Sequence, residues 1–259
     1  MELHLEGKTA LVTGSSSGLG EEIARLLAAE GANVVVHGRD EARAKAVAAD
    51  IGAVAVAIGD LSTDAGADAV AAAAGEVDVL VNNAGGYAHE DWSTSTPGQW
   101  RDIYEANVIS AVRMVQRLVP GMRARGWGRV VQIGGGLGSQ PIAVQPHYSA
   151  TLAARHNLAV SLARELKGSG VTSNVVSPGA ILVPSVRDWL TTQAPLNGWG
   201  ESWEEVERNA VHDLVPNDVN RFGRPEEIAG AVAYLVSPYA DYVSGATIRV
   251  DGGSVKSVV

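Results

Sequence analysis

A glycine-rich turn near the amino terminus places the strongest constraint on how this chain folds. Its sequence is Thr13-Gly14-Ser15-Ser16-Ser17-Gly18-Leu19-Gly20. An apolar run typical of a buried strand precedes it, and a helical pattern with Ile23, Leu26 and Leu27 on one face follows it. Glycines let the backbone bend sharply and approach a pyrophosphate, and a helix start offers free N–H groups to phosphates. The turn predicts a dinucleotide-binding loop, with an ordinary strand-to-helix connection as the alternative.

Length and composition narrow the class of protein. A chain of 259 residues, 46% of them hydrophobic, is long enough for one large α/β domain. A net charge of −9 without a basic run argues against nucleic acid, and the absence of cysteine excludes disulfides and thiolate metal sites. No His and carboxylate spacing suggests a metal site. Without a signal peptide or a long apolar span, we expect a cytoplasmic protein with no membrane partner.

Strand and helix patterns alternate along the chain. Strands are expected at residues 9–12, 33–37, 53–57, 77–81, 129–133, 171–176 and 247–250. Helices are expected from about residue 18 and at 40–50, 64–74, 97–123, 146–167 and 225–236, with Ser95 or Thr96 capping the helix that begins at Pro97. This alternation predicts one domain over residues 1–259, a doubly wound parallel sheet of seven strands. Residues 179–215, irregular or locally helical, are expected to form the substrate lid.

Ligands bind at the carboxyl ends of the strands in such a sheet, so the residues there are informative. After the second strand comes His37-Gly38-Arg39, with no acid to hold ribose hydroxyls. Arg39 can hold a 2′-phosphate, which favours NADP(H) over NAD, although it could also be a solvated turn residue. Asp60, after the third strand, could accept from an adenine amino group or cap the next helix. Residues 82–86 could run beside a flat cofactor or form only a tight turn.

Together these motifs resemble the classical short-chain dehydrogenase/reductase family. The resemblance spans nearly the whole chain and is carried by Thr13–Gly20, Asn82–Gly85, Asn107, Tyr148, Ser177–Gly179 and Val250–Gly253. It is closest to acyl-carrier-protein-reductase-like members, and it implies a Rossmann fold and a homotetramer, or a homodimer, through helices 97–123 and 146–167. With the strand-end residues, it implies NADP(H) contacts from Thr13, Gly14, Ser15, Ser17, Gly18, Leu19, Gly20, Arg39, Asp60, Leu61, Asn83, Ala84, Gly85, Tyr148, Pro178, Gly179 and Ile181.

The chemistry of that family rests on an asparagine, a serine, a tyrosine and a lysine. The tyrosine exchanges a proton with the substrate oxygen, the serine hydrogen-bonds that oxygen, the lysine lowers the tyrosine pKa, and the asparagine anchors a water relay. Asn107 and Tyr148 match the catalytic asparagine and tyrosine of the family. The serine position falls on Gly135 and the lysine position on Leu152, so two of the four groups have lost their chemistry.

The two departures predict an atypical site. A lysine cation about 5 Å from a phenol, at an effective dielectric near 20, is worth about 3 kcal/mol or about 2 pKa units. Without it, Tyr148 is expected to be a neutral phenol at neutral pH, a poor base for alcohol oxidation but a usable acid for reduction. Gly135 removes a donor to a developing oxyanion, which typically costs about 10²–10³ in rate.

Three neighbours are candidates to compensate. Ser139 could swing in from its flexible loop. His147 could reach the cleft, or be an exposed residue at a helix start. Arg155 lies seven residues after Tyr148 on the same helical face, which we expect to be too far along to replace a lysine and more suited to an interface.

The substrate side of the site is expected to be roomy and apolar, because Gly135 and Leu152 replace polar groups. A bulky, aromatic or polycyclic small molecule would suit it. The expected substrate contacts are Gly135, Leu152, Tyr87, Trp92, His147 and Trp189. The aromatic residues of the lid could equally be core packing of the lid itself.

We therefore expect an NADP(H)-dependent reductase of a C=O, C=N or activated C=C bond, with Tyr148 as proton donor and Asn107 in support. A non-redox enzyme on the same scaffold, such as a dehydratase, cyclase or isomerase, is the first alternative. A cofactor-binding subunit without catalysis, or a deliberately inactivated variant, is the next.

Overall fold

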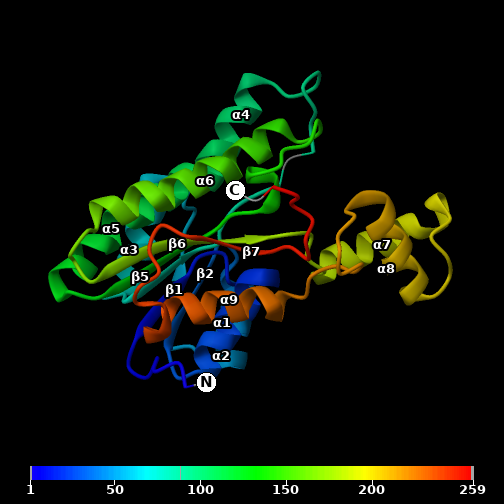
Figure 1. Cartoon of the computed structure of the whole chain (residues 1–259). Coiled ribbons are helices and arrows are strands. Elements are labelled where there is room, and N and C mark those ends of the chain that lie inside the picture. Colours follow the sequence, from blue (N-terminus) through cyan, green and yellow to red (C-terminus); the bar gives the residue numbers. More distant parts are fainter. Residues whose placement is uncertain (1, 88, 258–259) are drawn as a thin grey trace.

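Seven parallel strands form the centre of the molecule in the part of the chain that the structure, a computed structural model, describes, residues 2–87 and 89–257 (Figure 1). The strands are β1 (Thr9–Val12), β2 (Asn33–Gly38), β3 (Ala55–Ile58), β4 (Val79–Asn82), β5 (Gly128–Ile133), β6 (Val171–Pro178) and β7 (Thr247–Val250). Their order in the sheet is β3-β2-β1-β4-β5-β6-β7, and every neighbouring pair is parallel. The predicted doubly wound sheet is confirmed, with strand bounds that differ by at most two residues.

Helices cover both faces of this sheet. They are α1 (Gly18–Ala29), α2 (Glu41–Ile51), α3 (Asp64–Ala74), α4 (Pro97–Tyr104), α5 (Ser110–Arg125), α6 (Pro146–Glu165), α7 (Pro184–Asn197), α8 (Trp203–Leu214) and α9 (Pro225–Val236). One face carries α1, α2 and α9, and the other carries α3, α4, α5 and α6 (Figure 1). The strands are therefore buried on both sides, as parallel sheets require.

Two apolar cores flank the sheet, one on each face, because side chains alternate in direction along each strand. In β1, Ala10 and Val12 join the cluster under α1 and α9, while Leu11 joins the cluster under α3 and α5. Successive side chains of a strand point to opposite faces, so one apolar run supplies both layers. All three residues are at most 1% exposed.

The long helix predicted over residues 97–123 is interrupted. A π-helical segment, Glu105–Ile109, separates α4 from α5. Such a segment changes the hydrogen-bond register locally and frequently marks a functional site. Of the two predicted caps, Thr96 is the one observed. It forms a capping box with Gln99, and Pro97 is the first residue of the helix.

The lid region contains two regular helices, α7 and α8, which stand away from the sheet beyond the carboxyl end of β6 (Figure 1). They pack against each other around Leu190, Trp199, Val206 and Phe222. This is a small core of its own, separate from the two that flank the sheet. Among the described residues, no helix combines the length and the apolar character needed to cross a membrane.

Candidate active site

The turn between β1 and α1 is fixed by backbone packing. Gly14 and Gly18 have φ values of +68° and +59°, a region that favours glycine. A Cβ on Gly20 would lie 2.4 Å from the carbonyl oxygen of Gly14. Ser17, which precedes α1, caps no N–H group with its side chain. The first N–H groups of α1 thus have no side-chain cap at a glycine turn, the arrangement that accommodates a phosphate.

The loop after β4 is tied to this turn. Thr13 is buried, and its hydroxyl oxygen accepts from the N–H groups of Asn83 at 3.0 Å and Ala84 at 2.9 Å. The Asn83 side-chain Nδ2 donates to Thr13 O at 2.9 Å and to Gly14 O at 3.3 Å. Thr13 and Asn83, both predicted as cofactor contacts, therefore hold the two loops together.

His37, at the end of β2, braces the same turn from the other side. It is 3% exposed, its Nδ1 accepts from Gly14 N–H at 2.8 Å, and its Nε2 lies 3.1 Å from Gly59 O. These partners place the proton on Nε2, and burial lowers the pKa of His37, so the ring is neutral. Sequence reasoning noted His37 only as a non-acid; its bracing role depends on contacts between separate loops.

Arg39 and Asp60 lie at neighbouring strand ends. Arg39 is exposed and forms no ion pair or hydrogen bond with any residue that the structure describes, which leaves it available to an anion. Asp60 accepts from the N–H and hydroxyl of Ser62, contacts that lower its pKa. The residue that caps α3 is Thr63, so the alternative that Asp60 caps this helix is wrong.

The remaining predicted cofactor residues differ in burial and in position. Ser15 and Leu61 are buried, so their side chains are part of the scaffold. Pro178 ends β6, and a Cβ on the following Gly179 would lie 2.9 Å from the Asp251 Cα. Ile181 pairs with Gly223 in an isolated bridge at the base of the lid. Ser17, Gly18, Leu19, Ala84 and Gly85 all retain some exposed surface at the turn and at the β4 loop.

Tyr148 lies near the start of α6, partly buried, with the ring of Tyr87 5.3 Å away between centroids. Burial raises the pKa of Tyr148 well above its ordinary value, the charge of Tyr87 raises it further, and the charge of Arg155 opposes both. At neutral pH the side chain is a protonated phenol, which can donate a proton but is a poor base. Tyr87 is 77% exposed at the outer side of this pair.

Arg155 lies inside this site, contrary to the expectation that it serves an interface. It is 3% exposed, and its guanidinium donates to four backbone carbonyl oxygens. The partners are Asn107 O at 2.6 Å, Ile133 O at 2.7 Å, Asn82 O at 3.4 Å, and Ala84 O. These carbonyls belong to the ends of β4 and β5, the loop after β4 and the π-helical segment.

Asn107 sits in the π-helical segment and faces the β4 loop. Its Oδ1 accepts from Gly86 N–H at 2.7 Å, and its Nδ2 donates to Gly86 O at 3.1 Å and to the Thr151 hydroxyl at 3.0 Å. The Thr151 hydroxyl in turn donates to Tyr148 O at 2.7 Å. Asn107 thereby joins the cofactor loop to the first turn of the helix that carries Tyr148.

The loop after β5 is glycine-rich because α6 presents large side chains to it. A Cβ on Gly135 would lie 2.9 Å from Leu152 Cδ1, and one on Gly134 would lie 2.4 Å from His156 Nε2. Leu152 is 4% exposed. The expectation that losing the serine and lysine leaves a roomy pocket is wrong at this point, since Leu152 fills the space beside Gly135.

Two of the other expected substrate contacts, His147 and Trp92, lie in different surroundings. His147 is fully buried, with its ring 5.6 Å from that of Trp100 and its Nε2 3.2 Å from Glu90 Oε2, so it is neither an exposed residue nor a pocket wall. Trp92 is 70% exposed and lines a hollow of about 390 Å³ with Leu137, Ile142 and Ala150. Ser139 is exposed at the end of a short 3₁₀ turn.

The lid tryptophans divide between core and surface. Trp199 is 2% exposed, and its indole N–H donates to Asp213 at 2.9 Å. Trp203 packs beside this core under the guanidinium of Arg187, 4.4 Å from the ring centroid. Trp189 is 50% exposed on α7, so it stays a predicted substrate contact.

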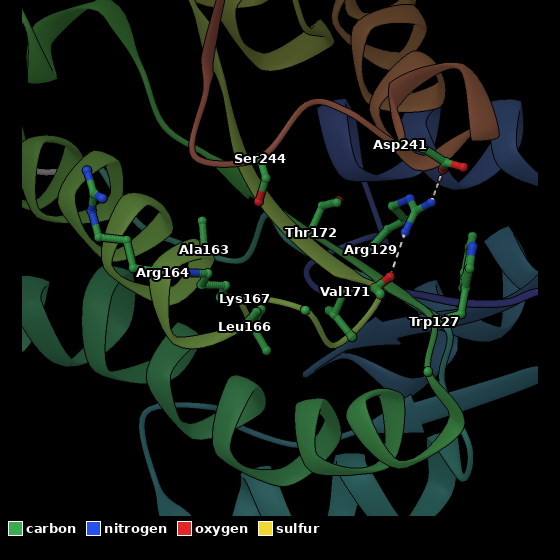
Figure 2. A pocket seen from close by; sticks show the side chains of 13 residues that line it. Trp127, Arg129, Ala163, Arg164, Leu166, Lys167, Val171, Thr172, Asp241 and Ser244 are labelled. Carbon is green, nitrogen blue, oxygen red and sulfur yellow. Dashed lines mark hydrogen bonds and ion pairs between the residues drawn. The ribbon is translucent and has the colours of Figure 1, made fainter.

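A larger open hollow of about 600 Å³ lies at the opposite end of the sheet (Figure 2). It is lined by residues near the amino ends of β5 and β6 and by the last turn of α6, including Arg129, Arg164 and Thr172. At 1.5 Å per residue, the end of α6 is about 25 Å from Tyr148. This hollow is therefore separate from the candidate active site. No group of three or more His, Asp or Glu side chains that could hold a metal exists within residues 2–87 and 89–257.

From the sequence, Arg155 was placed on the helical face of Tyr148 but assigned to an interface, and His156 was missed. Tyr148, Leu152 and Arg155 are spaced by four and three residues, so they share one helical face, and His156 follows Leu152 by four. That spacing was the available signal. The three glycines that follow Ile133 were the complementary signal, because a helix bearing large side chains needs small residues opposite it.

Comparison with known proteins agrees with this geometry. The short chain dehydrogenase family matches residues 8–194. The uncharacterized oxidoreductase YvaG of Bacillus subtilis is 37% identical, with all of both chains covered. The 3-oxoacyl-[acyl-carrier-protein] reductase FabG of Vibrio cholerae is 35% identical over 97% of this chain and 98% of its own. The crystal structure of L-sorbose reductase from Gluconobacter frateurii, complexed with NADPH and L-sorbose, superposes with a TM-score of 0.91 at 33% identity over all of both chains.

Proposed function

This chain belongs to the short chain dehydrogenase family, and we propose that it is an NADP(H)-dependent reductase in which Tyr148 donates a proton to the substrate. The class of bond reduced is a C=O, C=N or activated C=C bond. The single observation behind it is a chain of hydrogen bonds. Asn107 joins the β4 loop, which is tied to the glycine turn, to the first turn of the helix that bears the neutral, partly buried phenol.

The residues present fit an NADP(H) cofactor. In the turn, a Cβ on Gly14 or Gly20 would crowd neighbouring backbone, and the two glycines leave the backbone open to a phosphate. Arg39 is an exposed cation without a partner among the described residues, which suits a 2′-phosphate. The L-sorbose reductase that superposes on this chain was crystallised with NADPH. Gly14, Ser17, Gly18 and Gly20 would hold the pyrophosphate, and Asn83, Ala84, Gly85, Pro178, Gly179 and Ile181 the nicotinamide half.

When bound, NADPH supplies a hydride to the carbon of the reduced bond. The chain itself supplies the proton. The O–H bond of Tyr148 breaks, the proton passes to the substrate oxygen or its equivalent, and the electron pair stays on the phenol oxygen. Since burial keeps Tyr148 protonated, reduction is favoured over alcohol oxidation at neutral pH.

The substrate is a small molecule whose reacting group reaches Tyr148 past an apolar wall. Leu152 and Gly135 form the inner wall, and the exposed ring of Tyr87 stands outside Tyr148. A bulky apolar or aromatic group would bury more surface there than a small polar one. The lid, with Trp189 on α7, would close over it.

The proposed assembly uses α4, α5 and α6. The exposed positions Ala153, Asn157 and Ser161 recur every four residues along α6 and so lie on one face of it, without a charged side chain among them. We propose a homotetramer, or a homodimer, through these helices. Light scattering coupled to gel filtration measures the mass directly.

The test is NADPH consumption over a panel of bulky ketones, imines and activated alkenes, with Tyr148→Phe as the control. We expect turnover by the wild type and a loss of at least about 10²-fold in Tyr148→Phe. NADPH binding without consumption on any compound contradicts the reductase. Conversion of a panel compound without NADPH consumption supports the non-redox alternative, and a protein that binds NADPH but converts nothing supports the inactive subunit.

A further inference from the structure

The geometry points to Arg155 as the fixed cation of this active site. We propose that it is a positioning residue that holds the ends of β4 and β5 and the π-helical segment against α6, and that its charge stabilises the negative charge left on the phenol of Tyr148 when the proton departs. This inference rests on the proposed role of Tyr148 as the acid. It replaces the expectation that the phenol acts without help from any cation.

The first support is the hydrogen-bonding pattern of the guanidinium. Nε donates to Asn107 O at 2.6 Å and Nη1 to Ile133 O at 2.7 Å, while Nη2 donates to Ala84 O. A planar fork with five donors suits several carbonyls in fixed directions, whereas a lysine ammonium does not. Arg155 thus fixes the loop after β4 and the π-helical segment relative to α6.

The second support is that this charge is buried without a counter-ion. None of the described carboxylates forms an ion pair with Arg155. Burial lowers the pKa of Arg155 to about 10, so the guanidinium is still charged at neutral pH. A buried cation surrounded only by neutral carbonyls is costly, and a nearby negative charge relieves that cost.

The third support is the position of the phenol. Tyr148 and Arg155 lie on one face of α6, and Leu152 lies between them, 4% exposed. A medium of methyl groups screens the interaction poorly, so the charge of Arg155 acts on the phenol over a longer distance than it would in water. Among the described residues, Tyr87 from the β4 loop and Arg155 are the titratable groups whose charges act on Tyr148.

During proton donation the fixed position of Arg155 and its positive charge act together. The O–H bond of Tyr148 breaks, the proton moves to the substrate oxygen, and the phenol oxygen keeps the electron pair. The new negative charge forms on the helical face that also bears Arg155, a cation that cannot move because backbone carbonyls from three separate elements hold it. Little reorganisation is needed at the moment of transfer, which is the condition for effective electrostatic stabilisation.

The experiment measures the phenol directly, without cofactor or substrate. Tyr148 is replaced by 3,5-difluorotyrosine, a near-isosteric and more acidic phenol whose fluorine NMR shift reports its own ionisation. The same replacement is made in Arg155→Met, Arg155→Gln and Arg155→Lys. Arg164→Met is the matched control, because Arg164 is an exposed arginine of the same helix with no partner among the described residues. Circular dichroism establishes that each variant is folded.

We expect the ionisation midpoint to rise by about one pH unit in Arg155→Met and Arg155→Gln, and to stay at the wild-type value in Arg164→Met. A wild-type midpoint in folded neutral variants would mean that Arg155 only supports the backbone, and the inference would be wrong. If neither neutral variant folds, Arg155→Lys decides. It keeps the charge but loses the fork, so an unchanged midpoint supports the inference and a rise of about one unit overturns it. Failure of the reductase assay leaves this readout intact.

Discussion

Two glycine-rich loops at the same edge of the sheet have their glycines for different reasons. In the turn after β1, the nearest atoms to a Cβ on Gly20 are the Gly14 carbonyl oxygen at 2.4 Å and Asn83 Nδ2 at 2.5 Å. In the loop after β5, the nearest atom to a Cβ on Gly135 is Leu152 Cδ1 at 2.9 Å. The first contact involves backbone that cannot move, and the second involves the tip of a flexible side chain.

The φ angles show the same difference. Gly14 and Gly18 have positive φ values of +68° and +59°, whereas Gly135 is extended, with a φ of 173° that any residue adopts. The first loop therefore needs glycine for any sequence on this fold, while the second needs it only opposite this particular α6. The turn after β1 is thus constrained by its own backbone, and the loop after β5 is constrained by Leu152 and His156 of α6.

The largest expected effect compares one alanine in each loop. Gly20→Ala forces a methyl group against the backbone and should lower the free energy of unfolding by about 3 kcal/mol and abolish NADPH binding. Gly135→Ala meets only a leucine tip and should cost about 1 kcal/mol. Urea unfolding and NADPH fluorescence titration measure both. Equal losses at the two positions would remove the distinction between the loops.

The next largest effect is expected where Leu152 obstructs a serine at position 135. Gly135→Ser alone places its hydroxyl against Leu152 and should gain little. Gly135→Ser with Leu152→Ala makes room for the hydroxyl, which can then donate to the developing oxyanion and should raise turnover by about 10²-fold. Single-turnover rates of the two single variants and the double variant measure the coupling. Purely additive effects would mean that Leu152 does not obstruct position 135.

A smaller effect is expected at the edge of the cofactor loop. Arg39→Ala should weaken NADPH binding about tenfold while leaving NADH binding unchanged, because only NADPH carries a 2′-phosphate. Competitive fluorescence titration of both nucleotides gives the ratio, with Arg43→Ala as a neighbouring control. Parallel losses for the two nucleotides would show that Arg39 has no selective role.

The smallest effect is a pH dependence that differs between the loops. Burial lowers the pKa of both His37 and His156 below the ordinary value of about 6.5. Unfolding then takes up protons, so this stability is fully present above pH about 6.5 and falls as the pH drops below it. Both His37 nitrogens are hydrogen-bonded, while His156 Nε2 is buried without a partner among the described residues.

Protonation of His37 would remove the acceptor of Gly14 N–H. We therefore expect His37→Asn to reduce the loss of unfolding free energy between pH 7.5 and pH 5.5 more than His156→Gln does. Urea unfolding at the two pH values measures this difference in unfolding free energy for each variant. A larger change in His156→Gln would assign the acid sensitivity to the β5 loop instead.

Local sequence determined most of the scaffold. Apolar runs of about four to six residues between turns indicated the strands, and the order of strands and helices allowed few topologies. The turn at Gly14–Gly20, Asn107 and Tyr148 could be found because each sits in a short motif. The π-helical segment was not predicted, because the residues on either side of it keep a helical spacing and only the phase between the two parts shifts.

The sequence by itself determined that positions 135 and 152 hold a glycine and a leucine, from which the loss of a serine and a lysine is predicted, because identity at a position is a local fact. It did not determine which side chain fills the space beside position 135, or where a cation lies in the site. Only the tertiary structure placed Leu152 in that space, His147 in the interior and Arg155 among the carbonyls of β4, β5 and the π-helical segment. Packing and electrostatics act between segments brought together by folding, and the distance along one helix does not reveal which loops its side chains will meet.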